Sequence, residues 1–493
     1  MKSITKYDYK NFKRCPRLFA LGWINPSVLK VPLGPAEEFR INQGKEVGLL
    51  AQKLFAGVEG VVFEKTFTAG NLFTRPDVLN LKTYELIEIK SSADIRVKSS
   101  SKKKLNAAPK LIEKFLWDVA FQKYVLDKAK VKIDAVKIGH INNKYTRDGD
   151  LDLRKLFEIT DVTQEVEKEL SQVKVDLLAM EKIIKGREIP EAVIGAHCFK
   201  CKDRYDNECP LRKDCLGEHL NDTIFNLHLD TGGKRFKLFN RGIHFIKDIP
   251  DDVELTEFRA KQKEAERTNC PVIDYQAIKK YVEKVNYPIY YLDFETFDTA
   301  VPVFSGIRPY QKIPFQVSIH VEEERGKALK HYSFLRSDYR DPRIDLVEFL
   351  VEKINKGGTI MVYNERFEKP HIRELANEVS HFRQELLDFA NRIWDLWLIF
   401  DKGYYVHPGF KGSTSIKRVL PVLCSEEKNS YRDLDINKGD VTTLQYLKMI
   451  DPATPHDESD KIKNALLEYC EQDTYAMYAI FKKILELLDG KQC

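Results

Sequence analysis

The stretch RPDVLNLKTYELIEIKSS, residues 75–92, decides how the N-terminal half of the chain folds. Apolar and polar residues alternate on both sides of LKTY, which is the pattern of a β-hairpin. With the turn centred on Lys82 and Thr83, the register makes Asp77 face Glu88. Directly opposed residues on one sheet face lie about 5 Å apart at Cβ, so these two carboxylates can share one divalent cation.

A lysine completes this group of side chains. Lys90 follows Glu88 by two positions and therefore lies on the same face, while Ile89 points into the core. Two acids that hold Mg²⁺ or Mn²⁺ beside a lysine suit phosphodiester cleavage, because the metal lowers the pKa of a bound water. A surface ion pair on a hairpin is the commoner meaning of any single match of this kind.

Length and composition describe a multidomain globular protein. At 493 residues the chain exceeds one ordinary core, and 43% hydrophobic with 31% charged residues excludes a fibrous or disordered class. No apolar run approaches the roughly 20 residues of a membrane span, so no membrane partner is expected. The opening MKSITKYDYK lacks the apolar core of a signal peptide, which predicts a cytoplasmic location.

Changes in pattern along the chain predict an α/β protein with two domains and a connector. Residues 1–215 form the first block, and a helical connector covers residues 216–285. Strand and helix patterns alternate again over residues 286–493, which is a normal domain length.

One basic segment is a candidate for binding nucleic acid. The net charge of +5 does not by itself indicate nucleic acid, but RVKSSSKKKLNAAPK, residues 96–110, has six basic residues and no acid. Lys102, Lys103 and Lys104 at its centre suit contact with a phosphate backbone. A solvated lysine-rich loop explains the same letters equally well.

Four of the nine cysteines cluster in HCFKCKDRYDNECPLRKDC, residues 197–215. In a chain without an export signal this clustering indicates metal or cluster ligation rather than disulfides. Cys198 and Cys201, followed by Cys209 and Cys215, have the spacing of a self-contained zinc site with four thiolates.

A second group of acids comes from three segments of the C-terminal half. YYLDFETFD reads as a strand with Asp293 and Glu295 on one face, although solvated acids on an edge strand are the commoner case. GTIMVYNERFEKPHIREL reads as a strand that enters a helix, with Glu368 near the helix start. In the amphipathic helix LLEYCEQDTYAMYAIFKKIL, Tyr469 and Asp473 are four residues apart and share a face.

Three further features carry weaker signals. In YYVHPGFKGSTSIKRVLP, Lys417 and Arg418 can bind phosphates beside aromatic residues that stack on bases, but a turn packed by its own aromatics is an equal alternative. Asp395 is either a further acid of the site or a helix cap, and His371 is interpreted as structural.

The first group of motifs resembles the PD-(D/E)XK nuclease core of RecB-like enzymes. Asp77, Glu88 and Lys90 supply its core, and WDVAFQKYVL places Gln122 where these enzymes carry a Gln…Tyr helix. INQGKEVGLLAQKLF resembles their first helix and aligns Glu46 with its metal-binding position, near which RecB-like enzymes often have a histidine that this chain lacks. The resemblance implies metal ligation by the three acids and catalytic roles for Lys90 and Gln122.

RecB-like nucleases of the CRISPR-associated type also bind a [4Fe-4S] cluster through one early and three late cysteines. NFKRCPRLF places Cys15 in the matching early helix, and Cys209 and Cys215 have the spacing of the closing pair. Either Cys198 or Cys201 is the remaining ligand, because seven residues separate Cys201 from Cys209 where the family commonly has five. The resemblance implies a structural [4Fe-4S] cluster, with structural Zn²⁺ as the alternative.

The order of the C-terminal motifs resembles the DEDDy exonucleases of the RNase H-like fold. In these enzymes four carboxylates hold two metal ions about 3.5 to 4 Å apart. The resemblance assigns the metal to Asp293, Glu295, Glu368 and Asp473, and the positioning of water to Tyr469. Glu368 departs from the pattern, because the third acid is usually Asp.

The stretches AVPVFSGIRPYQKIPFQVSIHV and YYVHPGFKGSTSIKRVLPVL resemble a bacterial family of unknown function that fuses a RecB-like domain to an RNase H-like domain. The resemblance thus covers nearly the whole chain except the connector. The expected function is metal-dependent hydrolysis of DNA that has a free end or is single-stranded, with a 3′–5′ exonuclease-type C-terminal site and a second, RecB-like site. The alternative is a nucleic-acid clamp in which only one domain is catalytic. A zinc-stabilised scaffold without catalysis ranks last, because it leaves both groups of acids unexplained.

Overall fold

The computed structural model divides the chain into two compact units. It describes residues 2–30, 32–97, 110–195, 197–200, 209–217, 223–229, 233–354, 357–425 and 439–490. The first unit comprises Met1–Gly217 and Thr299–Gln311, and the second comprises Glu218–Asp298 and Lys312–Cys493. Most of the segment predicted as a connector thus clusters with the second unit.

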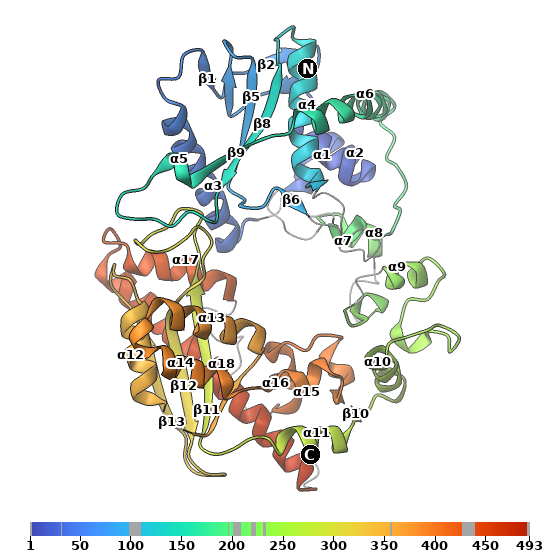
Figure 1. The fold of residues 1–493 in the computed structure, drawn as a ribbon. Coiled ribbons are helices and arrows are strands. Elements are labelled where there is room, and N and C mark those ends of the chain that lie inside the picture. The colour runs from blue at the N-terminus through green and yellow to red at the C-terminus, as the bar shows by residue number, and fades with distance from the viewer. Residues whose placement is uncertain are drawn as a thin grey trace. The chain divides into compact units, whose positions relative to one another are not determined.

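Both units combine helices with a five-stranded mixed sheet, so the predicted α/β class is confirmed (Figure 1). The sheet of the first unit has the order β1-β4-β5-β8-β9, in which β5 and β8 are parallel and the other neighbours antiparallel. Its strands are β1 (Val61–Phe63), β4 (Val78–Asn80), β5 (Glu85–Lys90), β8 (Ala135–Ile141) and β9 (Phe157–Asp161). Two separate two-stranded sheets are formed by β2 (Phe67–Ala69) with β3 (Leu72–Thr74), and by β6 (Arg96–Val97) with β7 (Lys110–Leu111).

The β4–β5 hairpin has the register that the alternation predicts, with Val78 opposite Ile87 and Asn80 opposite Glu85. The Asn80 side chain accepts hydrogen bonds from the backbone N–H groups of Lys82 and Thr83, which fixes the turn. This register, continued by one residue, brings Asp77 opposite Glu88.

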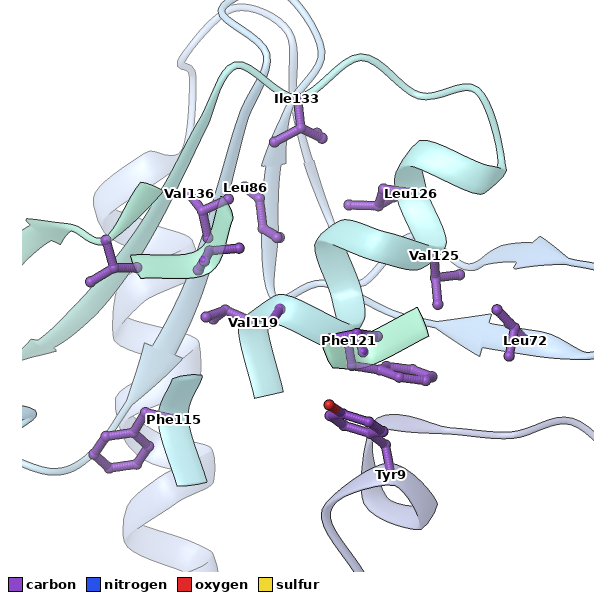
Figure 2. Packing of buried hydrophobic residues seen from close by; sticks show 14 of the residues in the cluster. Tyr9, Leu72, Leu86, Phe115, Val119, Phe121, Val125, Leu126, Ile133 and Val136 are labelled. Carbon is purple, nitrogen blue, oxygen red and sulfur yellow. The ribbon is translucent and has the colours of Figure 1, made fainter. Parts of the chain in front are cut away.

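Helices cover both faces of the first sheet. The helices of this unit are α1 (Lys6–Arg14), α2 (Pro16–Ile24), α3 (Pro35–Phe55), α4 (Glu113–Lys128), α5 (Leu153–Leu156), α6 (Thr163–Gly186), α7 (His197–Lys200) and α8 (Arg212–Leu216), with the 3-10 helix η1 (Pro26–Leu29). On one face Leu86 packs in a core with α1, α4 and α6, where the ring of Tyr9 stacks on Phe121 at 5.4 Å between centroids (Figure 2). On the other face Ile89 packs near Val47 of α3.

The sheet of the second unit has the order β13-β12-β11-β14-β15. The central strand β11 is antiparallel to β12 and parallel to β14, β12 and β13 are antiparallel, and β14 and β15 are parallel. The strands of this unit are β10 (Val272–Ile273), β11 (Ile289–Phe297), β12 (Ile313–Glu322), β13 (Lys330–Leu335), β14 (Thr359–Val362), β15 (Ile393–Asp395) and β16 (Tyr405–Val406), of which β10 and β16 form a separate pair.

Alternation along β11 sends its acids and its apolar residues to opposite faces. Leu292 and Phe294 join the apolar core with α12, α13 and α14, whereas α17 and α18 lie on the face of Asp293 and Glu295. The helices are α9 (Lys234–Phe239), α10 (Glu257–Thr268), α11 (Tyr275–Val282), α12 (Arg343–Lys353), α13 (Glu365–Glu378), α14 (Arg383–Asn391), α15 (Leu398–Asp401), α16 (Ile416–Leu423), α17 (Gly439–Ile450) and α18 (His456–Leu488), with 3-10 helices η4 (Ile224–Asn226), η5 (Ile246–Asp248), η6 (Ser380–Phe382) and η7 (Pro408–Phe410).

The helices α9, α10 and α11 carry the segment between the two sheets and pack within the second unit. The His228 ring stacks on Phe258 at 3.8 Å, and its Nδ1 lies 2.9 Å from the carbonyl oxygen of Gly412. The Tyr281 hydroxyl donates to the carbonyl of Asp395. Within the part of the chain that the structure describes, none of the helices combines the length and apolar character needed to cross a membrane.

We expect Phe121→Ala to destabilise the first unit by about 3–5 kcal/mol, because it removes a ring that is fully buried against Tyr9. Urea unfolding followed by circular dichroism measures the change. The control is Leu178→Ala on α6, where the side chain is 60% exposed and the expected cost is below about 0.5 kcal/mol. Equal effects of the two substitutions would contradict the core assignment.

Candidate functional site

The hairpin of the first unit brings four predicted site residues together. The Lys90 Nζ lies 2.7 Å from Glu88 Oε1, and Gln122 Nε2 donates to Glu88 Oε2 at 2.7 Å. The Asp77 carboxylate turns toward the strand, where its Oδ2 accepts from the backbone N–H of Ile89 at 2.7 Å. The β5 strand therefore presents Glu88 and Lys90 to α4, which supplies the glutamine.

Three members of this group were not predicted from the sequence. Lys90 Nζ also lies 2.7 Å from Asp118 Oδ2, and Lys10 Nζ lies 3.3 Å from the same oxygen. Lys6 Nζ from α1 lies 2.6 Å from Glu88 Oε1. Asp118 precedes Gln122 by four residues, so helical spacing could have revealed it, whereas only the tertiary packing of α1 brings the two lysines into this group.

The charges of this site balance one another. Burial opposes ionisation of Glu88, but Lys6 and Lys90 outweigh it and lower its pKa. Burial and then the charge of Glu88 raise the pKa of Asp77 to about 7. Three ammonium groups thus face three carboxylates, and within the described residues these carboxylates do not form a set of oxygens close enough to hold one metal ion. The side chains fit a divalent cation poorly in this arrangement.

Two other predicted parts of the first unit lie away from this group or outside the described ranges. Glu46 is on α3, which covers the face of Ile89, and burial alone, without a charge from the hairpin residues, raises its pKa. The predicted phosphate-binding residues Lys102, Lys103 and Lys104 lie outside the residues that the structure describes.

The cysteines of the first unit gather from three segments. Cys15, at the junction of α1 and α2, packs with Cys209 and Cys215 against Leu18 and Leu211. Burial raises the pKa of the Cys198 thiol, and the nearby thiols of Cys15 and Cys209 raise it further.

The spacing of these thiols bears on the choice of ion. No three of the described cysteine sulfurs lie within 4.8 Å of one another. A tetrahedral zinc ion with Zn–S bonds of about 2.3 Å requires sulfurs about 3.8 Å apart, whereas a cluster of four irons spreads its ligands more widely. Cys201, the other candidate ligand, lies outside the described residues.

The acids of the second unit form a compact cluster. Oxygen atoms of Asp293, Glu295 and Asp473 all lie within 4.8 Å of one another. The first two are on β11, and the third is on α18, which packs across the same sheet face. An all-oxygen set of this size matches the hard ligands that Mg²⁺ and Mn²⁺ prefer. Two of the three segments predicted to supply these acids, β11 and α18, therefore converge at this sheet face.

Glu368 is the fourth acid near this cluster. It lies in the first turn of α13, is 2% exposed, and its Oε2 has no hydrogen-bond partner among the described residues. Burial raises its pKa well above the ordinary value, and the charges of Asp395, Asp473 and Glu295 add to the shift. An orphaned carboxylate oxygen beside three other acids is a ready ligand for a cation.

The electrostatics of the cluster favour a bound cation. Burial, then Asp473, Glu295 and Glu368, raise the pKa of Asp293 well above its usual range. Burial and then Asp473 raise the pKa of Glu295 to about 8. Two carboxylates about 4.8 Å apart repel by about 3–4 kcal/mol at an effective dielectric constant of about 20, so a divalent ion relieves a large opposing energy.

Neighbouring side chains orient the acids. The Thr442 hydroxyl of α17 donates to Glu295 Oε2 at 2.7 Å, and the Cys470 thiol donates to Asp293 Oδ2 at 3.6 Å. The Lys417 Nζ donates to the Tyr469 hydroxyl at 2.9 Å and lies 4.7 Å from the centre of its ring. Lys417 was predicted as a phosphate contact, whereas nothing in its segment indicated this tyrosine partner.

The structure shows a helix-capping role for Asp395. Its carboxylate accepts hydrogen bonds from the backbone N–H groups of Asn364, Glu365 and Trp397. It therefore caps the start of α13, which carries Glu368, as the helix-cap interpretation expects.

The aromatic residues near Lys417 pack as a turn. The Tyr405 ring packs against Phe400 and Phe410, and His407 accepts from the backbone N–H of Gly409. Arg418, the other predicted phosphate contact, is exposed on α16. His371 packs edge-on against Phe367, in keeping with the structural interpretation.

We expect Lys6→Met to destabilise the first unit by about 1–3 kcal/mol, because it leaves the buried Glu88 with less compensating charge. The control is Lys82→Met, which removes an exposed pair with Glu59 that is worth less than about 1 kcal/mol. Chemical denaturation at pH 7 measures both. A Lys6 variant as stable as the Lys82 variant would show that this network is not needed for the fold.

The raised pKa of Glu295 predicts how cation binding depends on pH. A cation displaces the proton that Glu295 holds below about pH 8 in the ion-free protein. The apparent affinity for Mn²⁺ should therefore rise between about pH 6.5 and about pH 8.5 and level off above it, with proton release on binding. Calorimetry in buffers of different ionisation enthalpy measures both quantities. An affinity that stays constant over this range would contradict the shift.

The same shift gives the ion-free protein a stability that falls with pH. The folded state holds a proton on Glu295 up to about pH 8, whereas the unfolded chain releases it near its ordinary pKa. The folded state thus binds more protons across this window, and raising the pH through it costs stability.

Comparisons with known proteins find a family model and uncharacterised relatives that match part of the chain. Residues 290–415 match a domain of unknown function (DUF2779). The chain is 29% identical over 209 residues to the uncharacterized protein MG366 homolog of Mycoplasma pneumoniae, covering 38% of this chain and 31% of the relative. It is 25% identical over 233 residues to the uncharacterized protein UU173 of Ureaplasma parvum, covering 44% and 34%. The match spans about a third of each relative's length, and no solved structure matches.

Proposed function

We propose that this chain is a metal-dependent nuclease whose hydrolytic site is the acid cluster of the second unit. The observation that carries the proposal is that carboxylate oxygens of Asp293, Glu295 and Asp473 lie within 4.8 Å of one another, with the orphaned oxygen of Glu368 nearby. Two divalent ions bound there would lower the pKa of an attacking water and stabilise the leaving oxygen of a phosphodiester.

The neighbouring side chains have roles that suit this reaction. Burial, then Asp473 and Glu295, raise the pKa of Tyr469, so its hydroxyl keeps its proton and can donate a hydrogen bond to the attacking water. Because Lys417 donates to the same oxygen, it fixes the direction of that donation and offers positive charge to a phosphate. Thr442 and Cys470 hold the strand carboxylates in place, so they are positioning residues.

The topology of the second unit supports the proposal. Across the sheet the strands lie in the order β13, β12, β11, β14 and β15, which are the third, second, first, fourth and fifth of these strands in the sequence. Only β12 is antiparallel to its neighbours. This is the arrangement expected for the RNase H-like resemblance, with acids on the first strand and on the last helix. Fold alone does not establish activity, so the case depends on the acids. The 3′–5′ direction comes from the resemblance to DEDDy exonucleases.

For the first unit we propose the clamp, in which this unit binds nucleic acid and the second unit cuts. The observation that favours a non-catalytic role is that Lys6, Lys10 and Lys90 already compensate the carboxylates where a RecB-like metal ion would bind. The basic segment of residues 96–110 supplies positive charge in the same unit. If the first unit cleaves instead, substitution of Lys90 should show it as a loss of the chemical step.

We also propose that Cys15, Cys209 and Cys215, with Cys198 or Cys201, hold a structural [4Fe-4S] cluster. The packing of Cys15 from an early segment with Cys209 and Cys215 from a late one against Leu18 and Leu211 supports iron–sulfur over zinc, because a zinc site formed by the late cysteines alone would not need Cys15. The protein made without oxygen should then be brown and contain iron and sulfide. A colourless protein with one zinc ion would overturn this assignment.

The nuclease proposal predicts which variants lose cleavage. Asp293→Asn with Glu295→Gln should reduce Mg²⁺- or Mn²⁺-dependent cleavage by at least about a hundredfold, because it removes ligands that stabilise transition-state charge. The substrates are 5′- and 3′-labelled single- and double-stranded DNA and RNA, whose product ladders also report direction. The matched control is Glu322→Gln, which neutralises another buried acid on the same sheet face.

A second variant separates the two units. Under the clamp proposal, Lys90→Met leaves the chemical step at saturating substrate unchanged, and any loss falls on binding. Loss of the chemical step in this variant would assign cleavage to the first unit. If the second-unit variant cleaves as fast as the unmodified protein, the acid cluster is not the hydrolytic site.

A further inference from the structure

A second group of metal-ligand side chains lies in the second unit, on the same sheet face as the acid cluster. His320 of β12 is directly opposite His331 of β13, and their rings stack at 4.5 Å between centroids. Glu471 of α18 reaches them, with Oε1 lying 3.5 Å from His331 Nδ1. One ligand atom from each of the three residues lies within 4.8 Å of the other two.

Hydroxyl groups orient both imidazoles. Thr474 Oγ1 lies 2.8 Å from His320 Nδ1, and Ser318 Oγ lies 2.9 Å from His331 Nε2. The two hydroxyls are themselves 2.9 Å apart, which makes one continuous chain of hydrogen bonds. Each ring therefore uses one nitrogen for a hydroxyl, which leaves Nε2 of His320 and Nδ1 of His331 as ligand atoms. Histidines that bind metals are held in this way through their other nitrogen.

We propose that His320, His331 and Glu471 bind a divalent transition-metal ion, with Zn²⁺ as the ion that fits best. Two imidazole nitrogens and one carboxylate are softer than the all-oxygen set of the acid cluster, and they suit zinc with water in the remaining position. His320 is buried, whereas the Glu471 side chain is 50% exposed, so an ion can enter from the helix side.

The ion would fasten α18 to the sheet. Glu471 precedes Asp473 by two residues, and Thr474, whose hydroxyl lies against His320, follows Asp473 directly. An ion bound to β12, β13 and α18 would therefore fix the helix segment that carries Asp473. The existence of the site does not depend on the nuclease proposal, but this consequence for Asp473 rests on it.

The test is Zn²⁺ binding by the full chain after treatment with a chelator. Metal analysis after dialysis gives the number of ions, and competition with a chromogenic chelator gives the affinity. His331→Gln and Glu471→Gln should each lose one zinc equivalent relative to the unmodified protein. The control is His456→Gln, also on α18, which removes an exposed histidine that pairs with Asp460. Zinc bound by cysteines is common to all these proteins and cancels in the comparison.

Two further measurements keep the outcome unambiguous. Thr474→Val removes the hydroxyl that orients His320 and should weaken zinc binding by about 10- to 100-fold. Bound Cu²⁺ should show imidazole nitrogen couplings in its electron paramagnetic resonance spectrum, which neither thiolates nor the acid cluster can supply. These couplings should persist in the Asp293→Asn, Glu295→Gln protein, so failure of the nuclease proposal is seen separately in the cleavage assay.

Unchanged zinc content and affinity in both His331→Gln and Glu471→Gln would overturn the site. The Glu471 variant protects the test against misfolding, because its side chain is half exposed. If these variants lose thermal stability but keep their zinc, the metal site is likewise overturned, and the three residues form only a hydrogen-bonded stack that stabilises the fold.

Discussion

The constraint on which the second unit depends is the burial of like charges. Asp293, Glu295, Glu368 and Asp473 come from three separate segments, and burial and mutual repulsion raise the pKa of the first three. A core made only for stability would not gather them, since each close pair costs several kcal/mol. The sheet and α18 must therefore be held together by apolar packing elsewhere, and the site uses part of that stability.

The first unit solves the same problem in the opposite way. Its acids Glu88 and Asp118 are as deeply buried, but lysines from α1 and β5 compensate them within the chain. Lysines compensate this network, whereas in the acid cluster of the second unit burial and mutual repulsion still raise the pKa of Asp293 and Glu295. In the first unit the chain's own lysines compensate the charge of the buried acids, whereas in the second unit a bound cation would relieve the repulsion between them.

Sequence patterns predicted the parts of the fold that depend on local periodicity. Alternation with period two gave the register of the hairpin and the face shared by Asp293 and Glu295, and helical spacing placed Tyr469 with Asp473. Partners that arise from tertiary packing left no local signal: Lys6 reaches Glu88 from a helix 82 positions away in sequence. Thr442 and Glu471 likewise become neighbours of the strands only when α17 and α18 dock.

The long helix α18 runs from His456 to Leu488 and carries different chemistry on adjoining faces. Asp473 belongs to the acid cluster and Tyr469 lies beside it, whereas Glu471 belongs to the group with the histidine pair. Each residue turns a helix by about 100°, so deleting one position between these side chains would rotate one set away from the sheet. The spacing within this short stretch is therefore fixed as strictly as the identity of its residues, and length variation in this unit must fall outside it.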